Sequence, residues 1–400
     1  MINRSNNLCT SLFTRLLTIV FAVIFGLGSS MAKSKENLKL ESPVERYTVF
    51  NAGDDDVNTY RIPSLIVAND GALLVFGEAR RLSWRDKSRT DVVVKRSSDD
   101  GKTWTEMTDL TKGTSGAFMD PTPVVDRKTG KIFLFCNFWP ENDHSGKTNR
   151  AILITSNNNG LTWSEPIDLT EKLLGTDVWS MGFGPGSGFQ IENGKYKGRL
   201  IMPMRLKNSE TKHGYDIALF SDNDGQTWQL GNATAADNEF QIAEAATDTL
   251  IYNSRHRNER WVARSFDGGV NWTTEAADPE LPGVSRGCQA SIKNVDGTLY
   301  FCGIDGIDET VDFDERARLA LYRSKDGGKT WPESVTLYEK GAGYTCIERL
   351  PDNRLAIIFE AADTPGFTRK SVAGTEPPQR PAGWMRLDLL IVDPEKLAEN

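Results

Sequence analysis

The chain has 400 residues, of which 38% are hydrophobic and 26% are charged, and its formal net charge is -8. This is the balance of an ordinary globular protein long enough for a large core, and the acidic excess argues against a nucleic-acid partner. Frequent glycine (35 residues) among many short apolar runs favours an all-β fold that is rich in turns.

The N-terminus has the layout of a leader peptide. Arg4 and Arg15 precede an apolar run at 16–27, and small residues follow up to Ala32. A basic region, a short apolar region and a small-residue cleavage site make up a secretory signal peptide. A membrane anchor is the alternative, but roughly 12 apolar residues are too few for a bilayer that needs about 20. We therefore expect a signal peptide at 1–32. The mature chain, 33–400, is then exported to the periplasm or the extracellular space without membrane insertion.

Five copies of the pattern Ser-x-Asp-x-Gly-x-Thr-Trp follow along the chain. They lie at 97–104, 156–163, 221–228, 265–272 and 324–331. The Asp or Asn at the third position can accept hydrogen bonds from its own turn, and the Gly at the fifth supplies a positive φ. The Trp buries a large apolar face. The copies start 59, 65, 44 and 59 residues apart, which suits one four-stranded propeller blade per copy. We predict that these repeats are structural.

Apolar runs joined by turn dipeptides fill the gaps between the repeats. The runs at 64–79, 124–138, 293–304 and 348–361 each predict an antiparallel hairpin. The C-terminal run at 384–392 predicts a strand that completes the first blade. No segment has sustained helical periodicity and no Pro/Ser-rich linker divides the chain, which indicates a single domain in the mature protein.

The cysteines do not follow a metal-binding pattern. Cys9 falls in the expected leader, and Cys136, Cys288, Cys302 and Cys346 form no C-x-x-C pair, which argues against zinc. Two of them lie within strand-like runs and predict buried thiols that fill small apolar spaces. A disulfide is the alternative that an exported protein allows, and the sequence does not assign a pairing.

The motif Tyr60-Arg61-Ile62-Pro63 precedes the five repeats. This combination resembles the bacterial sialidase (neuraminidase) family, in which an F/Y-R-I-P motif stands ahead of a series of such repeats, called Asp-boxes. The resemblance covers essentially the whole mature chain. It implies a six-bladed β-propeller of four-stranded antiparallel blades. It also implies an exo-α-sialidase that removes terminal α-linked sialic acid from glycoproteins, glycolipids and oligosaccharides.

The resemblance further implies three arginines around the carboxylate of the substrate. Guanidinium groups bind carboxylates through paired hydrogen bonds, and several can surround one. Arg61 takes the first position, Arg255 the second, at the end of the stretch NEFQIAEAATDTLIYNSR, and Arg316 the third, at the start of RARLALYRS. Arg257 and Arg318 are rival candidates that the sequence leaves open.

The same family pattern implies Tyr344 as nucleophile, Glu239 as its base and Asp86 as acid/base. A neutral phenol avoids the repulsion that an anionic nucleophile would meet beside the substrate's carboxylate, and an adjacent base can activate it. Asp86 lies 11 residues before the first box. Asp91 is the neighbour most easily confused with it, but it opens an apolar strand, so we predict a structural role for Asp91.

Three further residues match the family's substrate contacts or their supports, and the stretch SRGCQAS at 285–291 offers a fourth candidate. Arg80 is expected at the sugar's 4-hydroxyl, Asp120 near the N-acetyl group and the same hydroxyl, and Glu360 as the partner of the first arginine. Gln289 is placed near the glycerol side chain. The glycine-rich segment 179–189 is either a loop of the active face or only a tight crossover.

The resemblance implies no metal and no organic cofactor, and sialylated glycans as the partners of a monomer. Two alternatives stay open. A non-catalytic sialic-acid lectin would keep the arginines but lose the Tyr/Glu pair or the Asp. A trans-sialidase or a sialidase with an anhydro product shares the fold and the residues, so only its products distinguish it.

Overall fold

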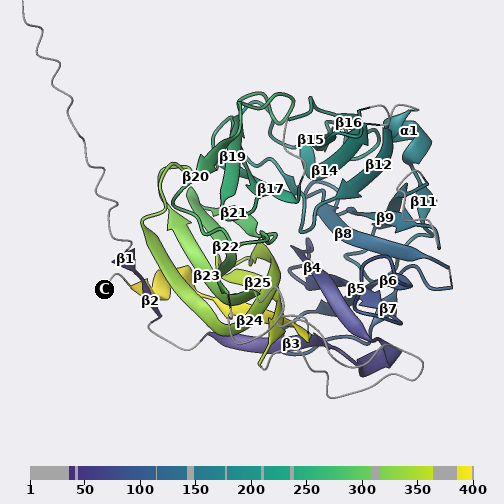
Figure 1. Ribbon diagram of the computed structural model, residues 1–400, viewed down its shortest axis with the longest axis horizontal. Coiled ribbons are helices and arrows are strands. Elements are labelled where there is room, and N and C mark those ends of the chain that lie inside the picture. Colours follow the sequence, from purple (N-terminus) through teal and green to yellow (C-terminus); the bar gives the residue numbers. More distant parts are fainter. Residues whose placement is uncertain are drawn as a thin grey trace, which may run out of the picture. The chain divides into compact units, whose positions relative to one another are not determined.

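Strands make up nearly all the regular structure of the computed structural model (Figure 1), which confirms the all-β class. The structure describes residues 36–40, 44–113, 115–141, 148–175, 178–208, 211–234, 238–307, 316–363 and 385–398. The expected leader at 1–32 lies outside these residues. One α-helix is described, α1 (Thr170–Leu174), with two 3-10 turns at Asp54–Asp56 and Pro394–Lys396. This agrees with the lack of helical periodicity in the sequence.

The first eight-stranded sheet contains the YRIP motif and the first two boxes. Its strand order is β11-β10-β9-β8-β6-β5-β4, and β7 pairs with β6. The strands are β4 (Thr59–Val67), β5 (Leu73–Arg80), β6 (Thr90–Ser97), β7 (Thr108–Asp109), β8 (Ala117–Val125), β9 (Ile132–Trp139), β10 (Arg150–Ser156) and β11 (Ile167–Asp168). All pairs are antiparallel except β6 with β8, where a parallel contact between Thr90 and Ala117 joins two groups of four strands.

Two smaller sheets follow along the chain. The five-stranded sheet comprises β12 (Val178–Phe183), β13 (Phe189–Gln190), β14 (Leu200–Asn208), β15 (Gly214–Ser221) and β16 (Gln229–Leu230). The four-stranded sheet comprises β17 (Phe240–Ala246), β18 (Thr249–Arg255), β19 (Arg260–Ser265) and β20 (Ala276–Asp278).

A second eight-stranded sheet joins the two ends of the chain. Its order is β21-β22-β23-β24-β25-β26-β3, and β1 (Glu36–Asn37) also pairs with β24. The strands are β21 (Ser291–Val295), β22 (Thr298–Ile307), β23 (Arg316–Ser324), β24 (Glu333–Arg349), β25 (Leu355–Ala362), β26 (Arg386–Val392) and β3 (Glu45–Asn51). The long β24 pairs with β23 through its first half and with β25 through its second. Near the ends, β2 (Lys39–Leu40) pairs with β27 (Leu397–Ala398).

The C-terminal run forms a strand, as predicted. β26 pairs with the N-terminal strand β3, in the sheet that also contains β24 and β25. This pairing brings together strands from opposite ends of the sequence. The four predicted hairpins are confirmed as the antiparallel pairs β4–β5, β8–β9, β21–β22 and β24–β25.

The Asp-boxes have the predicted turn chemistry. In the first copy, Asp99 Oδ1 accepts from the Thr103 amide at 2.9 Å, and the Trp104 indole donates to the Gly101 carbonyl at 2.9 Å. Gly101 has a φ of 86°, a conformation that glycine adopts without strain. The hydrogen bonds of this box are thus made within its own turn, as expected for a structural repeat.

The interior is apolar and contains no disulfide among the described residues. Part of the core lies between the two four-stranded groups of the first sheet, where Phe76 on β5 and Leu134 on β9 share a cluster with Trp163 packed against it. Cys136, Cys288, Cys302 and Cys346 are free and buried, which confirms the reading as apolar fillers. Within the described residues, no helix is long and apolar enough to cross a membrane.

The innermost strand of several groups positions the candidate site. Figure 1 shows β4, β8, β17 and β21 facing a common centre, and β24 contacts both β4 and β21. Side chains at or just before the starts of these strands can therefore meet although they are far apart in sequence.

Candidate active site

A tyrosine and a glutamate form the centre of the polar cluster. Tyr344 on β24 is 5% exposed, and its hydroxyl donates to Glu239 Oε1 at 2.5 Å. Arg255 Nη1 donates to the same hydroxyl at 2.9 Å and to Glu239 Oε2 at 2.7 Å. Glu239 directly precedes β17 and Arg255 ends β18, so the backbone pairing of these strands sets the geometry.

The electrostatics keep this pair as a neutral phenol beside an ionised carboxylate. Burial and then the Glu239 charge raise the pKa of Tyr344. Burial alone would raise the pKa of Glu239, but Arg255 and Arg205 outweigh it and lower that pKa to about 2. Glu239 is therefore ionised and accepts the hydrogen bond of the neutral Tyr344 hydroxyl.

Two further arginines lie against the Tyr344 ring. The guanidinium carbons of Arg61 and Arg316 are 5.2 and 5.3 Å from the ring centroid. Glu360 holds Arg61 with two bonds, from Nε at 2.9 Å and from Nη2 at 3.1 Å, and also accepts the Tyr344 amide at 3.3 Å. The family pattern's pairing of Glu360 with the first arginine is thus present. Gly343 makes room for it, because a Cβ there would lie 2.3 Å from Glu360 Oε2.

Two of the arginines around Tyr344 have buried N–H groups without a hydrogen-bond acceptor among the described residues. Arg316 Nε and Nη1 and Arg255 Nε have no hydrogen-bond acceptor in the part of the chain that the structure describes. Arg316 Nη2 donates to the Gly287 carbonyl at 3.1 Å. Buried charged donors are normally satisfied, so this array is suited to an anion that brings its own acceptors.

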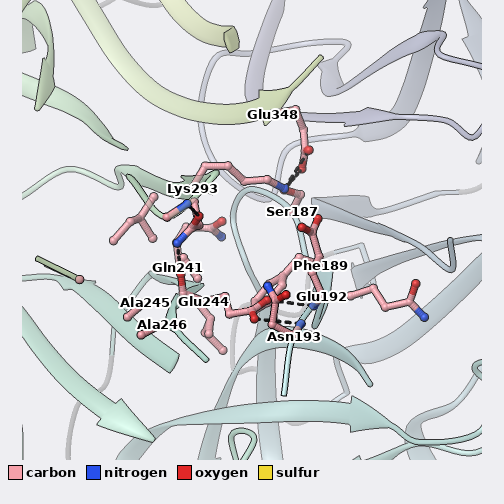
Figure 2. A pocket seen from close by; sticks show the side chains of 18 of the residues that line it. Ser187, Phe189, Glu192, Asn193, Gln241, Glu244, Ala245, Ala246, Lys293 and Glu348 are labelled. Atoms are coloured by element: carbon pink, nitrogen blue, oxygen red, sulfur yellow. Dashed lines mark hydrogen bonds and ion pairs between the residues drawn. The ribbon is translucent and has the colours of Figure 1, made fainter. Parts of the chain in front are cut away.

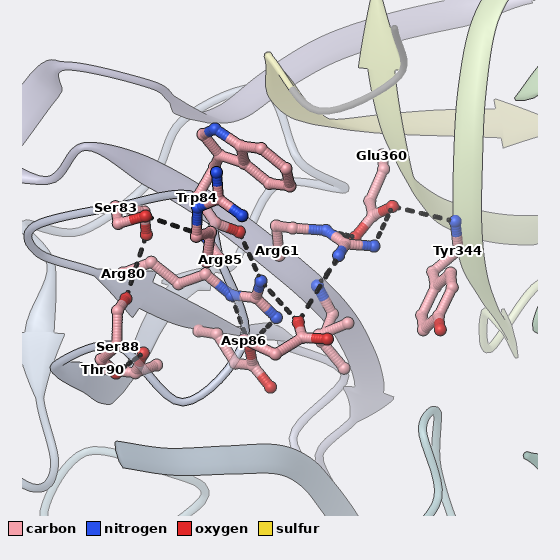
Figure 3. A network of polar contacts seen from close by, with 12 residues as sticks. Arg61, Arg80, Ser83, Trp84, Arg85, Asp86, Ser88, Thr90, Tyr344 and Glu360 are labelled. Carbon is pink, nitrogen blue, oxygen red and sulfur yellow. Dashed lines mark hydrogen bonds and ion pairs between the residues drawn. The ribbon is translucent and has the colours of Figure 1, made fainter. Parts of the chain in front are cut away.

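A loop between β5 and β6 brings a carboxylate to the edge of this array (Figure 3). Asp86 Oδ1 lies 2.7 Å from Arg80 Nη1 and 3.9 Å from Arg61 Nη1, and the Asp86 side chain is 68% exposed. Desolvation would raise the pKa of Asp86, but Arg80 and Arg61 outweigh it and hold that pKa below its ordinary value. Arg80 is fixed by Glu78 Oε2, which accepts from its Nε at 2.8 Å and its Nη2 at 2.7 Å.

Asp120 lies on the inner strand β8 and has neighbours that the sequence did not reveal. Its Oδ2 accepts from Asn137 Nδ2 at 2.8 Å and from Arg205 Nη2 at 3.2 Å, and its amide donates to Glu78 Oε1 at 2.9 Å. Burial raises the pKa of Asp120 to about 7, and the charges of Glu78 and Glu239 add to the rise. Arg205 opposes it.

The chain resembles known proteins over most of its length. The family described as a BNR repeat-like domain matches residues 71–357. The chain belongs to this family. Its relatives are sialidases, which confirms the predicted resemblance to the bacterial sialidases and to their propeller fold.

Three comparisons describe the relationship to the sialidases. A sialidase of Bacteroides fragilis is 29% identical over 347 residues, which cover 78% of this chain and 62% of that protein. A sialidase of Paraclostridium sordellii is 27% identical over 87% of this chain and 94% of its own length. The solved structure of Hadza microbial sialidase Hz136 is 25% identical, with a TM-score of 0.75 over 88% of this chain and 69% of that one. The chain thus spans less than two thirds of the Bacteroides relative.

Three of the candidates that the sequence offered lie outside the cluster. Arg318 pairs with Asp305 at 3.0 Å and its side chain is 49% exposed, and Arg257 is exposed. Asp91 accepts from Arg81 Nε at 2.7 Å. The geometry therefore favours Arg316 and Arg255 over their rivals and Asp86 over Asp91.

Gln289 does not present its amide to an open site. It is 1% exposed, its Oε1 accepts from the Thr345 amide at 2.9 Å, and its Nε2 donates to the Thr345 carbonyl at 3.0 Å. It therefore fixes the backbone next to Tyr344. Nε2 also approaches the Pro185 carbonyl of the glycine-rich segment at 3.3 Å, which ties that segment to the same strand.

Arg205 and Glu78 are the residues that sequence reasoning missed. Arg205 lies on β14, and the absence of a side chain at Gly182 leaves room for it, since a Cβ there would lie 2.6 Å from Arg205 Nη2. Its Nε is buried without a partner among the described residues. No local motif marks either residue. Nor do the described residues contain a group of three or more His, Cys, Asp and Glu that could hold a metal ion.

A cavity lies toward the ends of the inner strands opposite to the Tyr344 cluster (Figure 2). It has a volume of about 520 Å³ and is lined by late residues of the inner strands, including Ile66, Val125, Glu244 and Glu348. Its charges are satisfied within the protein. Lys293 Nζ lies 2.8 Å from both Glu348 oxygens, and the Glu244 oxygens accept the amides of Glu192 and Asn193 at 2.9 and 3.0 Å.

Proposed function

We propose that the protein is an exo-α-sialidase that hydrolyses terminal α-linked sialic acids of glycoproteins, glycolipids and oligosaccharides. The observation that carries this proposal is the phenol–carboxylate pair of Tyr344 and Glu239 beneath buried arginine donors without partners. Sialic acid has a carboxylate on its anomeric carbon, so an arginine array next to a neutral nucleophile suits that carbon. The relationship to sialidases supports the same activity.

In the proposed reaction, Arg61, Arg255 and Arg316 hold the substrate's carboxylate. Tyr344 Oη attacks the anomeric carbon while Glu239 takes the phenolic proton, and Asp86 donates a proton to the leaving oxygen. Asp86 then removes a proton from water, whose oxygen displaces Tyr344, and the phenolate recovers its proton from Glu239. Two displacements at one carbon give net retention.

The charges of the resting site suit these roles. Ionised Glu239 accepts the proton without first having to lose one, and Arg255 stabilises the phenolate that develops at 2.9 Å. Asp86 must be protonated to act as an acid, although Arg61 and Arg80 depress its pKa in the free protein. A bound carboxylate would offset the charge of Arg61, and this favours the proton on Asp86 once substrate is present.

The remaining polar residues have proposed supporting roles. Arg80 and Asp120 would contact the sugar at its 4-hydroxyl and N-acetyl side, and Arg205 joins them because it bonds Asp120 directly. Glu360 is a positioning residue for Arg61. We assign Gln289 to the support of the Tyr344 strand rather than to the glycerol side chain, because its amide group is bonded to Thr345.

The wider molecule is proposed to match the family pattern. Five antiparallel groups of four strands and one of five can be traced, because each eight-stranded sheet divides at β6–β8 or within β24. We propose that these groups are the six blades. We also propose that residues 1–32 direct export to the periplasm or beyond, and that the chain from 33 to 400 acts as a monomer without cofactor.

Turnover of a fluorogenic α-sialoside by the purified protein tests the proposal. Tyr344→Phe and Asp86→Ala should each lower kcat by about 10³-fold, within the range for loss of a nucleophile or a general acid. Tyr338→Phe is a matched control. Tyr338 is on the same strand and 9% exposed, but its hydroxyl donates to the Ala362 carbonyl at 2.9 Å, away from the cluster.

Normal turnover by both Tyr344→Phe and Asp86→Ala would overturn the assignment, and binding without turnover in the unchanged protein would indicate a lectin. Product analysis completes the test. Free sialic acid as the product supports hydrolysis. A transferred glycoside would instead indicate a trans-sialidase, and an anhydro sugar would indicate intramolecular attack.

A further inference from the structure

A buried arginine outside the Tyr344 cluster has no acidic partner within 4 Å among the described residues. Arg260 opens β19 and is 3% exposed. Its Nε donates to Asn253 Oδ1 at 2.7 Å and its Nη1 to the Cys288 carbonyl at 2.5 Å, and both acceptors are neutral. Nη2 is buried and bonds nothing in the described part of the chain. Burial lowers the pKa of Arg260 only to about 10, so the side chain is a cation at neutral pH.

His256 also has a buried ring nitrogen without a hydrogen-bond partner among the described residues. The ring of His256 stacks on Trp261 with the centroids 4.4 Å apart and the planes at 14°. Its Nε2 is buried, and no described residue bonds it. Burial lowers the pKa of His256, which makes the imidazole neutral near pH 7. In the tautomer with hydrogen on Nε2, this atom is a second donor.

Arg260 and His256 line the same small cavity, which has a volume of about 10 Å³. Val284, Ala290, Phe301 and Ile304 are among its other walls. Glu259 also borders it, but Glu259 Oε1 accepts from the Trp261 indole at 2.6 Å. A space of roughly this size holds one water-sized particle. A buried cation needs a compensating negative charge more than it needs a neutral water.

We propose that this cavity binds a single small monatomic anion, chloride under physiological conditions, between Arg260 Nη2 and His256 Nε2. Two buried donors of residues that line one cavity, apolar walls and a cation without an acidic partner within 4 Å among the described residues are the features that suit such an ion. Acceptors with several oxygen atoms, such as sulfate or a carboxylate, are too large for the space.

The location of the cavity connects it to the proposed catalytic arginines. Three successive carbonyl groups each accept from a different arginine: Arg286 from Arg255 Nη2 at 3.1 Å, Gly287 from Arg316 Nη2 at 3.1 Å, and Cys288 from Arg260 Nη1. An anion that fixes Arg260 therefore also fixes the backbone that orients Arg255 and Arg316. This consequence rests on the proposed function, whereas the binding of the ion does not.

Halide binding can be measured without any substrate. Crystals soaked in bromide should show an anomalous peak between Arg260 and His256. The melting temperature of the protein should rise with chloride at constant ionic strength, with gluconate as the replacing anion. His256→Phe retains the stacking on Trp261 but removes the donor, and should weaken the apparent halide affinity tenfold or more. His213→Phe is the matched control, because His213 packs on Tyr215 at the exposed surface.

The outcomes separate this inference from the proposed activity. A bromide peak and a halide response lost only in His256→Phe support the anion site, whether or not sialosides are cleaved. If cleavage occurs, chloride should lower KM more than it changes kcat. A water without anomalous signal in the cavity, or equal halide responses of His256→Phe and His213→Phe, would overturn the site.

Discussion

The two ends of the inner strands differ in how their charges are used. Toward the late ends lies a cavity of about 520 Å³, where Lys293 and Glu348 pair and the Glu244 carboxylate is bonded by backbone amides. At the early ends, Arg316 and Arg255 retain buried donors without partners among the described residues. The two ends therefore differ in whether their buried charged groups are satisfied within the protein.

This contrast shows why cavity size alone is a poor guide to function here. A buried ion pair satisfies itself and does not require a ligand. An unpaired buried donor raises the free energy of the protein, and a ligand with a matching acceptor lowers it again. The arginine array is therefore the end that selects an anion, and the cavity at the late ends is expected to be catalytically silent.

The largest effect expected from this contrast comes from replacing Arg316, whose buried donors lack partners at the early ends of the inner strands. Arg316→Met should lower kcat/KM by about 10²- to 10³-fold, because a bound carboxylate loses a buried charged partner. The stability should change little or rise, since Arg316 has two unsatisfied nitrogens in the free protein. Kinetics on an α-sialoside and urea unfolding measure the two quantities.

The matched control for this change is another buried arginine on the same strand. Arg323 on β23 is 9% exposed and is paired with Glu333. Arg323→Met should destabilise the protein while kcat/KM of the folded fraction stays within twofold. If Arg316→Met lost stability and retained kcat/KM, the unpaired donors would be a structural feature without a catalytic role.

The second prediction concerns the late ends of the strands. Lys293→Met leaves Glu348, which is 3% exposed, without its cation, and should lower the free energy of unfolding by about 2–3 kcal/mol. Adding Glu348→Gln should recover much of this loss, because no buried charge then remains. Denaturant unfolding of both variants measures the recovery. A tenfold loss of kcat/KM in Lys293→Met at unchanged stability would contradict the idea that this end is silent.

The sequence predicted the strand-local features well. Each Asp-box turn depends on residues a few positions apart, and each hairpin on one turn, so patterns in the sequence report them directly. Arg61, Glu239 and Tyr344 were accessible through motifs. Their meeting in one cluster depends on strands separated by more than a hundred residues.

The features that the sequence did not predict depend on contacts between distant strands. Arg205 lies on β14 and contacts Asp120 of β8 through space, and no local motif marks Arg205. Gln289 was placed at the substrate, but its amide bonds the backbone of a neighbouring strand. A single contact between β6 and β8 joins two groups of strands into the first eight-stranded sheet, and the continuous β24 joins two groups in the second. Hydrophobic patterns in the sequence do not encode these connections.

The smallest predicted effect is the pH dependence that Asp120 gives to stability. With a folded-state pKa of about 7, Asp120 holds a proton between pH 4 and 7 that the unfolded chain releases. Its stabilising contribution is therefore complete below about pH 4 and is lost as the pH rises through 7. Asp120→Asn should abolish this dependence of stability on pH. The unchanged protein should lose about 2 kcal/mol of unfolding free energy between pH 4 and 7, a value that allows for the share of Glu78 in the titration.

Thermal unfolding between pH 4 and 7 measures this slope, and Asp99→Asn provides a control of opposite sign. Hydrogen bonds from Thr103 lower the pKa of Asp99 to about 2, so its contribution is present above about pH 4 and disappears only in stronger acid. Asp99→Asn should therefore leave the slope between pH 4 and 7 unchanged. An equal slope in Asp120→Asn and the unchanged protein would mean that Asp120 is ionised throughout. The early ends would then have one more negative charge opposing an anionic ligand, which would weaken the contrast with the late ends.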